Sequence, residues 1–121
     1  MRIAVPTNDH ISLAEDIFQA RGIMVYMIEE NRIRSRLFRY FQFKKFIQQD
    51  GLLKLQVRRF AEFLHKCDWL VVGKMQDGLD EIAREAEVRV RLTKYRLLSE
   101  IQEELIHLNT IDHVYIKKVP R

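Results

Sequence analysis

The sequence predicts a single α/β domain, with a mixed central sheet, flanking helices and the element order βββαβαβα. Two short apolar runs, at residues 3–5 and 69–72, are typical of buried strands, and each ends in a polar loop. A strand–turn–strand pattern lies between them, and helical periodicity alternates with short strands after residue 52. A chain of 121 residues has room for one core, so we expect one domain over residues 1–121.

The first strand is expected to end at Pro6. Arg2 is its only charged residue, and residues 3–5 are apolar, as in a strand that is covered on both faces. Proline has no N–H group to donate to a central ladder, so the strand should stop there and a polar loop should begin at Thr7.

A hairpin is expected next, with strands at residues 23–28 and 32–43 joined by a polar turn at 29–31. In its second strand the odd positions are mostly apolar, namely Ile33, Leu37, Phe41 and Phe43. The arginines at positions 32, 34 and 36 fall between them, so we expect the odd positions to share one face and the arginines the other.

Three helices and two further strands are expected in the rest of the chain. The predicted core stripes are Leu53, Val57, Phe60 and Leu64 in the first helix, Leu79, Ile82, Ala83 and Ala86 in the second, and Leu98, Ile101, Leu105 and Leu108 in the third. The strands are expected at 69–72 and 88–92, and residues 114–116 are an optional last strand.

Composition narrows the class of protein. Hydrophobic residues make up 47% and charged residues 31%, as in ordinary globular domains, and we expect neither a membrane span nor a signal peptide. A single cysteine agrees with a reducing compartment, so the default location is the cytoplasm. The net charge of +4 favours an anionic partner, such as nucleic acid, a phosphorylated ligand or an anionic metal cluster.

Two polar loops are candidates for a ligand site. Loop 7–18 follows the first strand, and loop 73–78, with a glycine at each end, follows the strand at 69–72. Ligands of open α/β sheets bind outside the carboxyl ends of strands, where glycines and free helix N–H groups allow close approach. We expect the two loops to meet there.

The segments MRIAVPTND, Ile17-Phe18-Gln19-Ala20-Arg21, the strand at 23–28 with its turn, and 67–73 resemble the dinitrogenase iron-molybdenum cofactor biosynthesis family. The resemblance covers roughly the first ninety residues. It implies a ribonuclease H-like fold, and it implies a nitrogenase accessory protein, because some members of that family carry or insert the metal cluster of nitrogenase. Here Ile17 stands where the family has its leading histidine, and the glycine-rich stretch survives only as Gly73 and Gly78.

From this resemblance we expect a non-catalytic carrier of the iron-molybdenum cofactor or of an iron-sulfur precursor, working with nitrogenase or cluster-assembly proteins in nitrogen fixation. The expected cofactor-binding residues are His10, Phe18, Arg21, Gly73, Lys74 and Gly78. His10 is the candidate metal ligand, because neutral imidazole binds iron and molybdenum, and whether it compensates for Ile17 is open. Lys74 and Arg21 would be charge partners of an anionic cluster. An exposed loop histidine is the alternative for His10.

A rival interpretation rests on the basic and aromatic run from Arg32 to Lys45, which is typical of a nucleic-acid or protein interaction module. A half-buried strand with a charged outer face would have the same sequence pattern. An enzyme is disfavoured, because the first strand carries no acidic residue for a two-metal site and no nucleophile motif is present. Whether two copies form a homodimer through an edge strand is also open.

Overall fold

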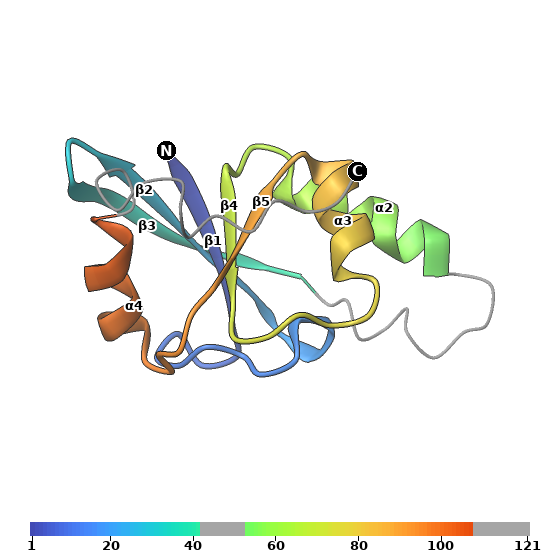
Figure 1. The fold of residues 1–121 in the computed structure, drawn as a ribbon, viewed down its shortest axis with the longest axis horizontal. Helices are drawn as coiled ribbons and strands as arrows, with labels where there is room; N and C mark the ends of the chain where they lie inside the picture. The colour runs from blue at the N-terminus through green and yellow to red at the C-terminus, as the bar shows by residue number, and fades with distance from the viewer. Residues whose placement is uncertain (42–52, 108–121) are drawn as a thin grey trace.

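The computed structural model describes residues 1–41 and 53–107, and these form one five-stranded sheet with helices against it (Figure 1). The elements are β1 (Arg2–Thr7), a 3-10 helix η1 (Ile17–Gln19), β2 (Gly22–Glu29), β3 (Arg32–Tyr40), α2 (Leu53–Leu64), β4 (Trp69–Val72), α3 (Leu79–Ala86), β5 (Arg89–Leu92) and α4 (Leu98–Leu105). The predicted α/β class is confirmed: the described chain has a mixed five-stranded sheet and three α-helices.

The sheet has the strand order β3-β2-β1-β4-β5. The β1–β2 and β2–β3 pairs are antiparallel, whereas β1–β4 and β4–β5 are parallel. Because β1, β4 and β5 run in the same direction, the loops that follow them leave the sheet at the same edge, which is at the bottom of Figure 1. This edge is where the two candidate loops were expected to meet.

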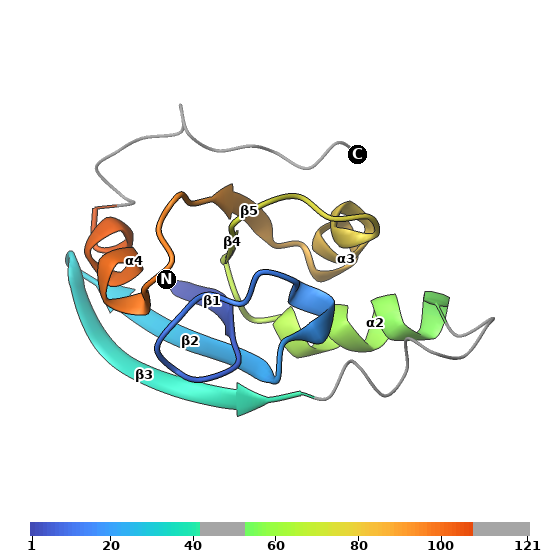
Figure 2. The ribbon, with the colours of Figure 1, turned by 90° about the horizontal axis from the view of Figure 1, so that it is seen from below.

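Helices cover both faces of the sheet and create two hydrophobic clusters. On one face α2 and α3 pack over alternate residues of β1, β4 and β5, with Phe60, Leu64 and Ile82 buried. On the other face α4 packs over β1, β2 and β4, and its predicted stripe is buried at Leu98, Ile101 and Leu105. The views in Figures 1 and 2 place α4 on the opposite side of the sheet from α2 and α3.

Pro6 does not end the first strand, contrary to the sequence prediction. It lies inside β1, opposite Ile23 of β2, and the strand continues to Thr7. The Pro6 carbonyl accepts the N–H of Ala14 at 2.9 Å, so the position that lacks an N–H faces the loop and not β2. Pairing of β1 with β4 covers only Ile3 and Ala4, so no ladder bond is lost at the proline.

The prediction that the odd positions of the second hairpin strand share one face is wrong. A bulge shifts the β2–β3 register, because Met27 pairs with Ser35 but Ile28 pairs with Ile33. Ile33 therefore packs against the α4 side, whereas Leu37 lies on the opposite face and is 62% exposed. The predicted extension of this strand to residue 43 lies partly outside the described residues.

The other helical stripes agree with their predictions where they are described. Leu79, Ile82, Ala83 and Ala86 of α3 are all buried. Phe60 and Leu64 of α2 are buried as well. Leu108 and the optional strand at 114–116 lie outside the described residues, as do the side chains of Leu53 and Val57. No helix within the described ranges is long and apolar enough to cross a membrane.

Candidate functional site

The loops after β1 and β4 are joined by one amide side chain. Gln76 Oε1 accepts the N–H of Ile17 at 2.8 Å, and Gln76 Nε2 donates to Asp16 Oδ1 at 2.8 Å. The same Asp16 oxygen accepts the N–H of Phe18 and so caps η1. Loops 7–18 and 73–78 are therefore in contact, and Asp16 caps η1.

The first loop is held in shape by Asp9. Its carboxylate accepts the N–H groups of Ile11 at 2.9 Å and Ser12 at 2.8 Å, and the Ser12 hydroxyl at 2.8 Å. These hydrogen bonds, the backbone ones above all, lower the pKa of Asp9 to about 2. The carboxylate is thus ionised at neutral pH and is already occupied by donors of its own loop.

A third segment, between β5 and α4, completes the edge. The N–H of Leu13 donates to the Arg96 carbonyl at 2.7 Å, and the N–H of Leu98 donates to the Ile11 carbonyl at 2.8 Å. The side chains of Arg96 and Glu15 form an ion pair between the same two segments. The loop after β1 is therefore fixed on one side to the loop after β4 and on the other to residues 93–97.

A pocket of about 320 Å³ opens among these three segments, and we refer to it as the carboxyl-edge pocket. Its lining residues are Leu13, Glu15, Gly73, Lys74, Thr93, Lys94, Tyr95 and Arg96. Three of these side chains are cationic and only Glu15 is anionic. Within the described residues neither Lys74 nor Lys94 forms an ion pair. The pocket therefore carries a net positive charge.

Two of the six predicted site residues line this pocket, and four do not. Gly73 and Lys74 lie on its wall, and a Cβ atom added to Gly73 would lie 3.5 Å from Leu13 Cδ2. His10, in contrast, has a positive φ of 65° and stacks on Phe38 of β3, with the ring centroids 4.1 Å apart. It is an exposed loop histidine that contacts the hairpin and does not line the pocket.

The other three predicted residues lie on the α3 side of the loops or at the start of β2. Gly78 has a φ of 88° and precedes α3, and a Cβ atom there would lie 3.7 Å from the Phe18 ring. Arg21 is exposed, and its backbone N–H donates to Asn8 Oδ1 at 2.8 Å. None of these three is among the residues that line the carboxyl-edge pocket.

The described side chains do not provide a set of protein ligands for a metal cluster. Among residues 1–41 and 53–107 no three His, Cys, Asp or Glu side chains lie together in a way that would hold a metal ion. Cys67 precedes β4 and so lies at the amino end of that strand, away from the pocket; it is buried, and burial raises the pKa of its thiol.

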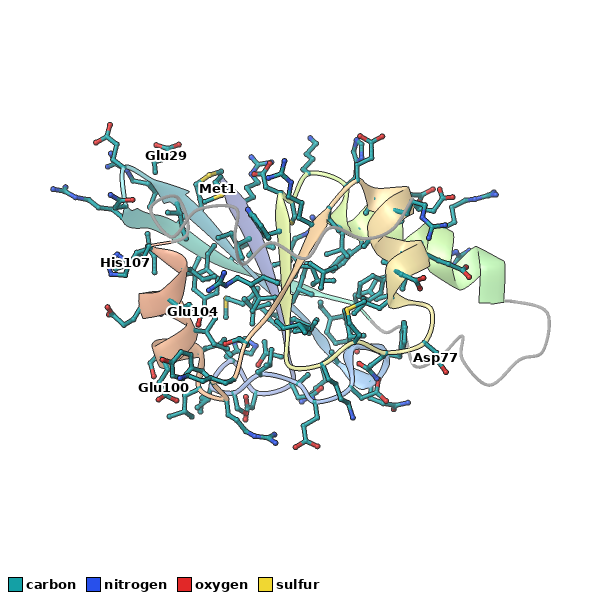
Figure 3. All side chains as sticks on the ribbon, viewed as in Figure 1. Met1, Glu29, Asp77, Glu100, Glu104 and His107 are labelled. Atoms are coloured by element: carbon teal, nitrogen blue, oxygen red, sulfur yellow. The ribbon has the colours of Figure 1, made fainter. Side chains whose placement is uncertain are left out.

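Three of the four arginines of the rival surface contact other groups of the protein. Arg34 Nε lies 3.8 Å from Glu29 Oε2. Arg36 Nη1 donates to Gln102 Oε1 of α4 at 3.0 Å. The guanidinium group of Arg39 lies over the Phe63 ring and donates to the Phe63 carbonyl. We refer to Arg34, Arg36 and Arg39 as the β3 arginines. Figure 3 shows the neighbouring Glu29 at the turn end of this hairpin.

No protein-family profile matches this chain, and no curated protein matches it by sequence. Two crystal structures do resemble it in three dimensions. PH0822 superposes with a TM-score of 0.67 at 13% sequence identity, over 98% of this chain and 96% of that one. This chain shares its fold. A "putative dinitrogenase" (MJ0327) from Methanocaldococcus jannaschii superposes with a TM-score of 0.62 at 7% sequence identity, over 100% of this chain and 96% of that one. At such low identity these likenesses show the fold alone, a distant link to a dinitrogenase-related structure.

The pocket residues after β5 were not found by sequence reasoning. Thr93, Lys94, Tyr95 and Arg96 follow a strand that is parallel to β4, so they leave the sheet at the same edge as loop 73–78. The signal was present, because a strand–helix–strand unit was predicted at 69–92 and its two strands must be parallel.

Proposed function

We propose that this protein is a non-catalytic accessory domain that binds an anionic cargo in the carboxyl-edge pocket. In this proposal the fold is ribonuclease H-like, and the chain is a divergent relative of the dinitrogenase iron-molybdenum cofactor biosynthesis family. The resemblance of the first ninety residues supports this relationship, and so does the dinitrogenase name of one structural neighbour. The partners would then be nitrogenase or cluster-assembly proteins, in the cytoplasm.

The observation that carries the proposal is the pair of lysines in the pocket. Lys74 and Lys94 line it from different loops, and neither is neutralised by a carboxylate among the described residues. Two ammonium groups without counter-charges at one site repel each other and attract an anion. The lining groups include no nucleophile hydrogen-bonded to a general base among the bonds described, which supports a binding role over catalysis.

The proposed cargo includes the anionic metal clusters of nitrogenase assembly, the iron-molybdenum cofactor or an iron-sulfur precursor. The groups that would hold it are the ammonium groups of Lys74 and Lys94 and the guanidinium group of Arg96. His10 stays the candidate for direct ligation of a metal, but it does not line the pocket, so its role is tested separately from that of the cations. Charge, and not side-chain ligation, is therefore the main source of affinity in this proposal.

The first experiment measures binding of inorganic phosphate and of molybdate by calorimetry at low ionic strength. The variant is Lys74→Gln with Lys94→Gln, and the matched control is Arg58→Gln with Lys66→Gln, which also removes two positive charges, from exposed side chains outside the pocket. We expect the double variant to bind each anion at least about 10-fold more weakly, and the control to bind as the wild type does. Absence of saturable binding to wild type, or equal binding by the double variant, would overturn the proposal.

A second experiment tests the metal cargo. The protein is reconstituted anaerobically with iron and sulfide, desalted, and analysed for metal and visible absorption. We expect a coloured complex with stoichiometric metal that is lost in the double lysine variant. Loss of the coloured complex in His10→Ala but not in the lysine variant would show ligation by imidazole and contradict binding by charge. A colourless, folded wild-type protein that still binds phosphate would restrict the cargo to simple anions.

A second candidate function is an interaction module that uses the Arg32 to Lys45 surface. One observation favours it: Leu37 and Tyr40 of the edge strand β3 are 62% and 54% exposed. Exposed apolar and aromatic side chains on an edge strand are suited to an extended protein segment or to single-stranded nucleic acid. Residues 42–45 of that surface lie outside the described residues.

A further inference from the structure

The carboxyl-edge pocket is larger and less polar than a site for a bare anion requires. Its volume of about 320 Å³ lies at the lower end of the range of small-molecule pockets, about 300–1,000 Å³. Leu13 and Tyr95 contribute half-buried apolar surface to its wall, and Gly73 contributes no side chain at all. The pocket therefore has room for an organic body next to the charged group of a ligand.

The charges of the lining residues indicate how much negative charge the ligand carries. Lys74, Lys94 and Arg96 contribute three positive charges, and Glu15 contributes one negative charge, which leaves a net charge of +2. A ligand with two negative charges would balance this set, whereas a monocarboxylate would leave one cation unneutralised. A phosphate monoester is a dianion near neutral pH and is small enough to sit among ammonium and guanidinium groups.

The position of Tyr95 indicates where the organic body lies. Lys94 Nζ lies over one face of the Tyr95 ring, 5.4 Å from its centroid, in a cation–π contact. A phosphate bound by this ammonium group lies beside the ring, and its ester substituent can contact the ring surface that lines the pocket. A planar, unsaturated substituent gains more from an aromatic wall than a flexible polar one does, because flat π-systems stack. Charge and aromatic surface thus lie side by side, as recognition of a phosphate attached to a planar ring requires.

We propose that the carboxyl-edge pocket binds a phosphate monoester of a small planar organic molecule, of the size of a nucleoside monophosphate. The proposal rests on the proposed function, because it uses the same cations, and it adds the chemical class of the ligand. Lys74, Lys94 and Arg96 hold the phosphate. Tyr95 and Leu13 hold the planar body, and Thr93, a buried residue directly after β5, also lines the pocket.

The test compares four probes by calorimetry in the full chain: AMP, ribose 5-phosphate, inorganic phosphate and adenosine. The variant is Tyr95→Leu, and the matched control is Tyr40→Leu, which changes an exposed tyrosine on β3. We expect wild type to bind AMP at least about 10-fold more tightly than ribose 5-phosphate or inorganic phosphate, the gain expected from one stacked ring. Tyr95→Leu should remove this gain without changing the affinity for inorganic phosphate, and Tyr40→Leu should leave both affinities unchanged.

The outcomes separate this inference from the function on which it rests. Equal affinity for AMP, ribose 5-phosphate and inorganic phosphate would overturn the planar ligand but leave the anion site intact. An AMP preference that survives Tyr95→Leu would overturn the role of this ring. Tight binding of adenosine would show that the base and not the phosphate is recognised, against both proposals. No binding of any phosphate would overturn the proposed function itself. Circular dichroism spectra of the variants establish that each is folded.

Discussion

Two regions of this protein are rich in cations, and they differ in what surrounds the charges. In the carboxyl-edge pocket Lys74 and Lys94 have no carboxylate partner among the described residues. The three β3 arginines, in contrast, each contact a carboxylate, an amide or an aromatic ring of the same chain. A run of basic residues in a sequence is therefore a weaker sign of a ligand site than two lysines brought together by loops far apart in the chain.

The difference has a physical origin in the local fold. A long strand at the edge of a sheet places its side chains beside the neighbouring helices, so Arg36 reaches α4 and Arg39 reaches α2. Loops at the carboxyl ends of parallel strands have no element beyond them, so their side chains face solvent and any ligand in it. Cations that contact groups of the packed helices should matter for stability, and cations without a carboxylate partner should matter for binding.

The largest effect is expected at the most completely partnered cation. Arg91 of β5 donates to Glu104 of α4 at 3.3 Å, and the two side chains are only 9% and 16% exposed. Figure 3 shows Glu104 between α4 and the strands, whereas His107 points away from them. Replacing Glu104 by leucine leaves the guanidinium group buried without its carboxylate. We expect the free energy of unfolding in urea to fall by about 3 kcal/mol.

The double variant Arg91→Leu with Glu104→Leu tests the reason for that loss. If the cost comes from an unpaired buried charge, removing both partners should recover most of the stability. Glu100→Leu, an exposed position on the same helix, is the control and should change stability little. A double variant that is as unstable as the sum of the two single variants would contradict the charge explanation.

Much of the fold could be predicted from the sequence, because burial leaves a periodic signal. The stripe of Leu79, Ile82, Ala83 and Ala86 and the strand at 69–72 were predicted at the residues where they occur. The β2–β3 bulge and the place of Pro6 inside β1 were not predicted. Both features depend on the side of the strand to which a given N–H group points. The register between neighbouring strands sets that side, and the sequence of one strand does not show it.

The candidate site was predicted less well than the fold. The sequence indicated that loops 7–18 and 73–78 would meet, and the Gln76 hydrogen bonds join them. Half of the pocket comes from residues 93–96, which no motif marks. The family resemblance indicated His10 and Phe18 as site residues. In the structure His10 stacks on Phe38, and Phe18 lies near Gly78. Proximity in space between distant loops has no local signature in a single sequence.

An effect of intermediate size is expected on replacing two of the β3 arginines. We expect Arg36→Gln with Arg39→Gln to lower the free energy of unfolding by about 1 kcal/mol, because an amide hydrogen bond and a cation–π contact are lost. Phosphate affinity in the pocket should be unchanged. Binding of a single-stranded oligothymidine, measured by fluorescence anisotropy over a series of salt concentrations, should not change with these substitutions. Loss of tight oligonucleotide binding with a shallower salt slope would instead favour the interaction module.

The smallest effect is expected at the pocket cation that has a carboxylate partner among the described residues. Arg96 and Glu15 form an ion pair at the rim, and both side chains are 72% exposed, so the pair itself adds little to stability. It nevertheless matters for binding, because a dianion in the pocket must compete with Glu15 for the guanidinium group. Glu15→Gln removes the competitor and raises the net charge of the lining residues from +2 to +3. We expect inorganic phosphate to bind about threefold more tightly, with Glu62→Gln on α2 as a control of equal charge change. A weaker phosphate affinity in Glu15→Gln would mean that Glu15 orients Arg96 toward the ligand. A cation with a carboxylate partner would then belong to the binding site, and the two regions would differ less than the contacts indicate.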